Sequence, residues 1–335
     1  MRKEKVLEIS FARMFALVMV IILHIIPVFE NMGDCIWFIV LQGGVAVYVI
    51  ISAVLMAEQQ YDDALAAIRK KCVRLLKPYW IWILAVFLVY FVIGYKWNFM
   101  NLQTLLFLGQ NHSVYNQYVL PGFGHLWYIP FILSCYLLTP ILKWLFCSVR
   151  DRGETFFLFF LSCYCIVFFW IGRYWNFIGP GSYICYYVLY GGSFLCWKYY
   201  KAHNKFFFNR KTRVIELGGI ILCSIFYLYV VYVKGSSVQG TNFLWVYRSF
   251  LGLLLFDMFY HLGSRMARHY KLRKLVNVSD EYNYELYLVH KTWLDGGLAI
   301  RTMGLPSLVG VILTLFAMAG SAWGLHRVSV WRRKR

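Results

Sequence analysis

A cation and an imidazole inside one apolar segment are the side chains of this sequence best suited to chemistry. Arg13 and His24 lie in the apolar segment 9–29, eleven residues apart. On a helix this spacing is three turns plus about 20°, so both side chains project from one face, about 16 Å apart along the axis. Ionisable groups within membrane helices are costly and usually functional. The pair predicts a polar channel through the membrane. The structural alternative is that Arg13 extends to the lipid headgroups and that His24 is only a packing residue.

Two later stretches place further histidines beside aromatic residues. His125 and Trp127 stand at the outer start of one predicted helix, where His125 could cap or gate a pocket and Trp127 also suits an interfacial aromatic belt. Tyr287 and His290 are three residues apart on another predicted helix and therefore share a face. Glu285 lies in the same apolar surroundings, where a carboxyl group is expected to be neutral or paired.

A basic cluster occupies residues 69–77, directly before an apolar segment. Arg74 is the cation that we single out, because a guanidinium can bind the phosphates of a nucleotide-like donor. The alternative is that the cluster only sets the orientation of the chain in the membrane, which is the expected role of most of its cations. We expect the following helix to begin near Pro78, since proline suits the first turn of a helix.

Other polar residues indicate structure more than chemistry. Asp257 and His261 are four apart on a predicted helix, so they can meet, and we favour a structural pair. The nine cysteines form no CxxC pair, and the chain has neither the HExxH nor the GxSxG pattern. The sequence therefore predicts no metal site and no permanently bound cofactor.

The elements that must position these residues are long apolar helices. The chain has 335 residues, of which 61% are hydrophobic and only 15% are charged, and no long polar stretch could form a separate soluble domain. We predict one membrane domain over residues 1–335, an all-α bundle of about ten transmembrane helices. The predicted spans are 9–29, 35–56, 78–95, 125–147, 155–171, 182–200, 214–233, 242–262, 282–300 and 306–326.

The positive charges are distributed unevenly among the gaps that separate these spans. Most lie at the two ends and in every second gap, within 2–5, 69–77, 150–152, 198–213, 265–274 and 332–335. The other gaps contain only Lys96, Arg173, Lys234 and Arg301. Both termini are therefore predicted to lie in the cytoplasm. The same distribution explains the formal net charge of +19 without a nucleic-acid partner, for which no motif is present.

The longest predicted outer loop covers residues 97–124. It is rich in Asn, Gln, Tyr, His and Gly, and it contains a short apolar stretch at Leu105–Leu108. Loops of this length are uncommon unless they are functional. We therefore expect part of it to fold back over the membrane as a lid.

Several of these stretches, taken together, resemble the acyltransferase-3 family of bacterial membrane proteins. The resemblance covers residues 13 to 290, with the motifs in the family's order. The matching positions are Arg13 and His24, the glycine-led segment 43–56, Arg74 with Pro78 and Tyr79, His125–Tyr128 with Tyr136 and Pro140, and 283–290.

The chain departs from the family pattern at a few positions. Ala53 replaces a usual glycine, and Asn283 replaces a usual serine. In the basic run, Lys70 and Lys71 precede Arg74 where many members have a second arginine. Lysine cannot form the planar bidentate fork of arginine, so the details of donor binding are expected to differ.

The resemblance implies a stand-alone membrane O-acyltransferase in the bacterial cytoplasmic (inner) membrane. It would move an acetyl group from cytoplasmic acetyl-CoA, as a co-substrate, to a hydroxyl of a carbohydrate or glycolipid that is exported or on the cell surface. The implied catalytic residues are His24, as general base or acyl carrier, with His290 and Tyr287, which would stabilise the oxyanion or orient the acceptor. The implied donor-binding residues are Arg13 and Arg74. The residues implied for acceptor binding or gating are His125, Trp127 and Glu285.

Three other functions remain open on the sequence. A transporter or flippase for a small polar or lipid-linked solute would also place ionisable groups inside membrane helices. A transferase could use succinyl-CoA in place of acetyl-CoA. A receptor-like or accessory subunit without chemistry is the least favoured, because polar motifs lie on four separate predicted helices.

Overall fold

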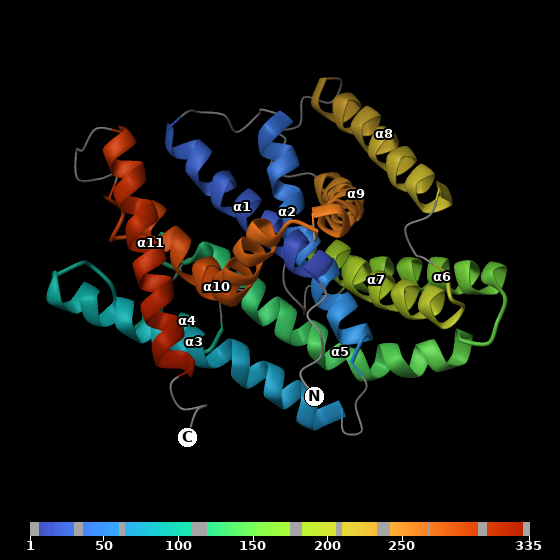
Figure 1. The fold of residues 1–335 in the computed structure, drawn as a ribbon, viewed down its shortest axis with the longest axis horizontal. Helices are drawn as coiled ribbons and strands as arrows, with labels where there is room; N and C mark the ends of the chain where they lie inside the picture. Colours follow the sequence, from blue (N-terminus) through green and yellow to red (C-terminus); the bar gives the residue numbers. More distant parts are fainter. Residues whose placement is uncertain are drawn as a thin grey trace. The chain divides into compact units, whose positions relative to one another are not determined.

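The computed structural model describes residues 7–29, 36–59, 64–108, 119–174, 183–205, 210–232, 242–266, 268–300 and 307–330. These residues form eleven α-helices and one short 3-10 helix, η3, and contain no strand (Figure 1). The all-α prediction is thus confirmed for the described chain. The helices are α1 Leu7–Phe29, α2 Ile36–Ala57, α3 Ala64–Val92, α4 Phe99–Leu106, α5 Tyr128–Val149, α6 Glu154–Tyr174, α7 Ile184–Ala202, α8 Arg210–Tyr232, α9 Asn242–Met266, α10 Tyr270–Asp295 and α11 Ser307–Val330, with η3 at Gly124–Trp127.

Five stretches of described helix are long and apolar enough to cross a membrane. They are Leu7–Ile25, Val40–Ala57, Leu65–Val92, Gly124–Val149 and Leu308–Val330. Glu154–Phe168 is also apolar but shorter. A bilayer core needs about 20 mostly apolar residues, and these five stretches are close to that length or exceed it. Ten crossings, and the placement of both termini in the cytoplasm, remain predictions.

The helix expected to begin near Pro78 begins fourteen residues earlier, at Ala64, and Pro78 lies inside α3. The expected boundary was therefore wrong. The residues before the proline are mostly Ala, Leu, Lys and Arg, which are strong helix formers. A proline inside a membrane helix loses one backbone hydrogen bond, which neighbouring groups can compensate. Pro140 likewise lies inside a helix, α5.

Two other segments also differ from the expected boundaries. The helix predicted at 282–300 is α10, which begins at Tyr270 and ends at Asp295, because its first turns are polar but helix-forming. In the predicted outer loop, residues 99–106 form α4. Its first turn has a reciprocal capping box, in which Asn98 and Asn101 each accept the other's backbone N–H at 2.9 and 2.8 Å. The rest of the predicted lid, residues 109–118, lies outside the described residues.

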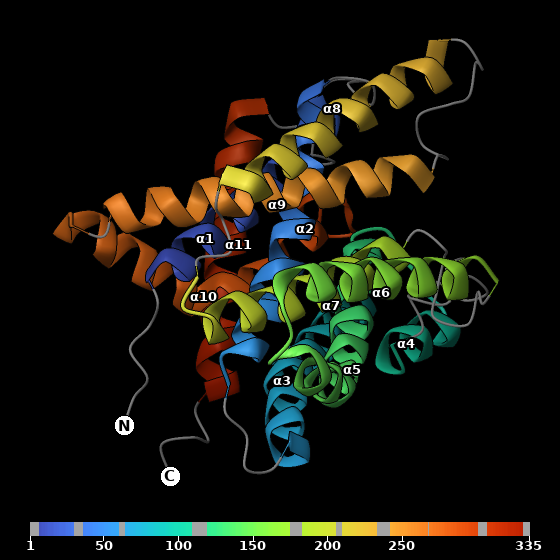
Figure 2. The same ribbon diagram turned by 90° about the vertical axis from the view of Figure 1, so that its right-hand side faces the viewer.

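The helices group into two compact units, each described by itself. The first comprises residues 1–23, 32–62 and 135–276. Its helices pack as pairs, α6 with α7 and α8 with α9, and α2 contacts both α7 and α9 (Figure 2). A side chain at Gly252 of α9 would overlap Ala46 of α2. Small residues allow this close backbone approach, which is typical of helix packing in membranes.

The second unit comprises residues 24–31, 63–134 and 277–335. In it α3 packs against α11 and α4. The Tyr79 hydroxyl donates to the Leu105 carbonyl oxygen at 2.6 Å, and Lys77 donates to the Ser329 carbonyl oxygen. The Tyr284 hydroxyl donates to the carbonyl oxygen of Leu75 at 2.8 Å, which ties α10 to α3. This second unit contains all three histidines that the sequence analysis assigned to chemistry.

Candidate active site

Three imidazoles from distant parts of the sequence meet in the second unit. His24 lies near the end of α1, His125 lies in η3 and His290 lies on α10. The ring centroids of His24 and His290 are 5.3 Å apart, those of His125 and His290 are 4.5 Å apart, and those of His24 and His125 are 6.5 Å apart. The structure therefore brings together the three histidines that were predicted on three separate helices. We call these three residues the imidazole cluster.

The approach of η3 to the end of α10 depends on a glycine. Gly122 has a φ of 87°, in the left-handed region that favours glycine. A Cβ at this position would lie 2.7 Å from the Cα of Gly296 and 3.2 Å from the Cα of Thr292. The backbone before η3 can therefore touch the last turn of α10 only because Gly122 lacks a side chain. This contact places His125 opposite His290.

Tyr287, which also lies on α10, makes a second contact with η3. Its hydroxyl donates to the backbone carbonyl oxygen of His125 at 2.5 Å. Its ring lies 5.4 Å from the ring of His125 and 5.7 Å from that of Tyr128, centroid to centroid. Tyr287 and His290 share a face of α10 as predicted, with centroids 5.8 Å apart. The hydrogen of the Tyr287 hydroxyl is therefore used in a hydrogen bond to the backbone of η3.

Backbone carbonyl groups define the tautomers of the two buried histidines. Nδ1 of His290 lies 2.7 Å from the Tyr287 carbonyl oxygen, and Nε2 of His125 lies 3.2 Å from the Leu288 carbonyl oxygen. A carbonyl oxygen only accepts, so each of these nitrogens carries the hydrogen. The other nitrogen of each neutral ring, Nε2 of His290 and Nδ1 of His125, is then a lone-pair acceptor.

Both acceptor nitrogens are buried and lack a hydrogen-bond partner among the described residues. His290 is 0% exposed and His125 is 5% exposed, whereas His24 is only partly buried. A buried polar atom without a partner calls for an explanation, and a catalytic role is one such explanation. The cluster therefore offers two unused proton acceptors beside the partly buried imidazole of His24.

Lys291 joins the cluster and was missed by the sequence analysis. Its ammonium group lies 3.7 Å from the position that a Cβ on Gly124 would occupy, directly before His125. It interacts electrostatically with His24, His125 and His290. The only sequence signal was its position next to His290, which does not show where a long side chain points.

Glu285 is paired, as its apolar surroundings predicted. One carboxylate oxygen lies 3.0 Å from Nδ1 of His326 on α11, and Glu281 lies 3.4 Å from Nε2 of the same ring. Glu285 is five residues before His290, which is about 140° around the helix. The two side chains therefore leave α10 in different directions, and Glu285 faces α11.

The remaining predicted residues lie in varied surroundings. Arg74 is exposed on α3, where a phosphate group can reach it. Trp127 is half-buried in η3, with its ring 6.1 Å from Tyr128 and 6.0 Å from Phe131. Arg13 is partly buried on the portion of α1 that belongs to the first unit. Their roles in donor or acceptor binding stay predictions.

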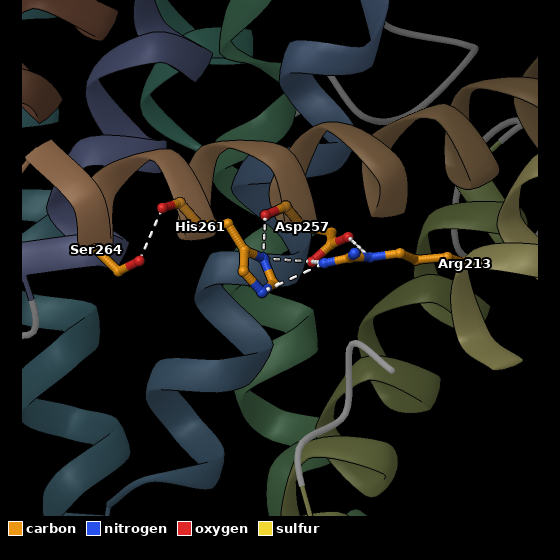
Figure 3. Close-up of polar contacts among 4 residues, drawn as sticks. All are labelled: Arg213, Asp257, His261 and Ser264. Carbon is orange, nitrogen blue, oxygen red and sulfur yellow. Dashed lines mark hydrogen bonds and ion pairs between the residues drawn. The ribbon is translucent and has the colours of Figure 1, made fainter. Parts of the chain in front are cut away.

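The Asp257–His261 pair forms as expected and includes a third residue (Figure 3). Nδ1 of His261 lies 2.7 Å from Oδ1 of Asp257. Arg213 of α8 donates from Nε to Oδ2 of Asp257 at 2.7 Å, and its Nη2 lies 3.3 Å from Nε2 of His261. Arg213 had been counted only among the cations that orient the chain. The network ties α8 to α9 within the first unit.

Replacing Asp257 by asparagine is expected to lower stability. The Asp257 side chain is 4% exposed, and its loss of charge removes the partner of Arg213. Hydrogen bonds to charged groups contribute about 1.5–3 kcal/mol, and the partial exposure of Arg213 favours the lower end. Thermal unfolding of the purified protein in detergent measures the change. Asp151→Asn is the control, because its contact with Arg150 at 3.7 Å is exposed; an equal loss in both variants would contradict a special role for the network.

Comparison with known proteins identifies the family of the chain. Searches of curated proteins and of solved structures each gave no match. A family model described as an acyltransferase domain matches residues 6–327, which include the whole imidazole cluster. The match covers nearly the whole chain and therefore shows the family. The chain belongs to the acyltransferase-3 family and, with its long apolar helices, is a membrane acyltransferase.

Proposed function

We propose that this protein is a membrane O-acyltransferase that moves an acetyl group from cytoplasmic acetyl-CoA to a hydroxyl of an exported or cell-surface glycan. The observation that carries the proposal is the imidazole cluster, in which two buried rings present unused acceptor nitrogens beside the partly buried His24. Acyl transfer to a hydroxyl needs a group that removes the hydroxyl proton. The family match supports the same reaction class.

In the proposed reaction His24 removes the proton from the acceptor hydroxyl. The hydroxyl oxygen bonds to the thioester carbonyl carbon, the C–S bond breaks, and the CoA thiolate takes the proton from the protonated His24. His24 suits this role because it is the least buried of the three imidazoles. The alternative, in which His24 first carries the acetyl group and then passes it to the hydroxyl, uses the same contacts.

The two substrates are proposed to arrive from opposite sides of a bacterial cytoplasmic membrane. Arg74 would bind the phosphates of CoA at the cytoplasmic side, and Arg13 is a separate candidate for donor binding. Trp127 and His125 would lie toward the acceptor, whereas Glu285 pairs with His326 of α11 and faces away from His290. This arrangement would let a donor that is made in the cytoplasm modify a glycan that is finished outside, without releasing either reactant into the wrong compartment.

Sealed membrane vesicles test this two-sided reaction. Inside-out vesicles that contain the protein would receive acetyl-CoA labelled in the acetyl group on their outer, cytoplasmic face. The proposal expects label in the glycan fraction as an alkali-labile ester, and expects none with vesicles of the opposite orientation. Label that enters the glycan equally in both orientations would contradict cytoplasmic donor binding.

Arg74→Ala is expected to weaken the binding of acetyl-CoA about tenfold. A charge-assisted hydrogen bond from an arginine to a phosphate contributes about 1.5–3 kcal/mol, and exposure of Arg74 to solvent reduces this value. Equilibrium binding of CoA to the purified protein measures the effect. Arg150→Ala is the control because this arginine is also exposed, between α5 and α6. Equal affinity in wild type and Arg74→Ala would leave Arg74 with only an orienting role.

A further inference from the structure

A lysine lies at the imidazole cluster, where no cation was expected. Lys291 directly follows His290, and its ammonium group lies against Gly124, the residue before His125. Its side chain is 21% exposed, and it interacts electrostatically with all three imidazoles. A mostly buried ammonium group beside three uncharged rings is costly, so a structural role alone explains it poorly.

The imidazole cluster supplies acceptors more readily than donors. The N–H of His290 points to the Tyr287 carbonyl oxygen, and the N–H of His125 points to the Leu288 carbonyl oxygen. The Tyr287 hydroxyl donates to the His125 carbonyl oxygen. These three hydrogens are thus committed to the backbone. The unused nitrogens of the two buried rings are acceptors, and acceptors repel a negative oxygen.

Acyl transfer nevertheless passes through a negative oxygen. When the acceptor hydroxyl adds to the thioester carbonyl carbon, the carbonyl electron pair moves to oxygen and forms an oxyanion. Donors placed at this oxygen before the reaction are usually the largest single contribution to catalysis. Lys291 provides three N–H donors and a positive charge at the edge of the cluster.

Asp295 is an ion-pair partner of Lys291, but it makes no close hydrogen bond to the ammonium group. Its Oδ2 lies 3.8 Å from Nζ of Lys291, one helical turn further along α10, and its side chain is 43% exposed. This separation exceeds hydrogen-bonding distance, so the described contact leaves the N–H groups of Lys291 directed elsewhere. On the other side, the absence of a side chain at Gly124 leaves room for the ammonium group beside η3.

We propose that Lys291 is a catalytic residue that binds the oxyanion of the tetrahedral intermediate through its ammonium group. The inference rests on the proposed acyltransferase function. The ammonium group donates a hydrogen bond to the oxyanion and keeps its own proton. When the intermediate collapses, the oxyanion electron pair re-forms the C=O bond, the C–S bond breaks, and the thiolate takes its proton from the protonated His24. Lys291 thus changes the rate without changing the proton balance.

The test compares turnover in three variants of the purified full-length protein. Loss of one oxyanion donor lowers kcat by about 10²–10³-fold in enzymes where it has been removed. Lys291→Met is therefore expected to lower kcat for acetyl-CoA by about 10²-fold, with KM for acetyl-CoA little changed. Lys291→Arg keeps the charge and is expected to retain at least about a tenth of wild-type kcat. Lys274→Met, an exposed change on the same helix, is the matched control and should behave as wild type.

Several outcomes would overturn the inference. Wild-type kcat in Lys291→Met, or a defect confined to KM, would show that Lys291 does not stabilise the transition state. A loss seen only with succinyl-CoA, and not with acetyl-CoA, would make Lys291 a binding residue for a carboxylate on the acyl group. If Lys291→Met does not fold, Lys291→Gln takes its place.

Wild-type protein that transfers nothing from acetyl-CoA would overturn the proposed function itself. An active wild type together with an equally active Lys291→Met would overturn only the role of Lys291.

Discussion

His24→Ala is expected to lower the rate of acyl transfer by about 10²–10⁴-fold, the usual contribution of a general base. If His24 instead carries the acetyl group, the loss is expected to be at least as large, because the reaction then has no covalent intermediate. The ring of His24 is the most accessible of the imidazole cluster, and it lies 5.3 Å from the ring of His290. The O-acetyl content of the surface glycan, normalised to the amount of protein in the membrane, measures the change in cells.

A second histidine provides the control for this experiment. His269 is exposed just before α10, so His269→Ala removes an imidazole of the same size away from the cluster. It is expected to leave O-acetylation at the wild-type level. An unchanged O-acetyl content in His24→Ala, with normal protein levels, would exclude His24 from the reaction.

His290→Asn is expected to lower kcat by about 10²-fold while the protein still folds. An asparagine amide can donate to the Tyr287 carbonyl oxygen much as Nδ1 of His290 does, at 2.7 Å, but it has nothing in place of the acceptor Nε2. The variant therefore removes the unused acceptor and keeps the structural hydrogen bond. Turnover of acetyl-CoA by the purified protein measures kcat, and thermal unfolding in detergent measures stability.

The comparison variant is Tyr287→Phe, which keeps the ring but loses the hydroxyl that holds η3. It removes the hydrogen bond to His125 at 2.5 Å and should lower the unfolding temperature as well as activity. His290→Asn and Tyr287→Phe thus separate chemistry from positioning. A His290→Asn protein that loses stability and activity in parallel would mean that the buried imidazole is needed for packing and not for its acceptor nitrogen.

Much of the helical architecture could be predicted from hydropathy, but helix ends could not. Each of the ten predicted apolar spans corresponds to a helix, because a long apolar run in a membrane protein must satisfy its backbone internally. The boundaries failed where a polar or basic stretch continues a helix. In α3 the basic residues before Pro78 are helical, and α10 begins twelve residues before the predicted start. Hydropathy identifies residues that are buried in lipid. It does not identify the polar residues by which a helix continues beyond the lipid.

The candidate site could be predicted in its members but not in its geometry. The sequence indicated His24, His125 and His290, and the structure brings them together. It could not indicate which nitrogen of each ring is free, because the backbone carbonyl groups that decide this come from Tyr287 and Leu288 in the folded chain. The directions of long side chains could not be predicted either. Lys291 reaches toward η3, and Arg213 reaches across to Asp257, in directions that spacing along one helix does not determine.

The consumption of acetyl-CoA by the purified protein tests the central claim most directly. Wild type and His24→Ala, purified in parallel in detergent and supplied with a glycan acceptor, would be followed by the release of the free thiol of CoA. We predict that wild-type protein releases one CoA for each acetyl ester formed on the acceptor, and that His24→Ala releases at least about 10²-fold less per unit time. Equal release by both proteins would contradict catalysis by the imidazole cluster. No release by folded wild-type protein would contradict an acetyl-CoA-dependent transferase.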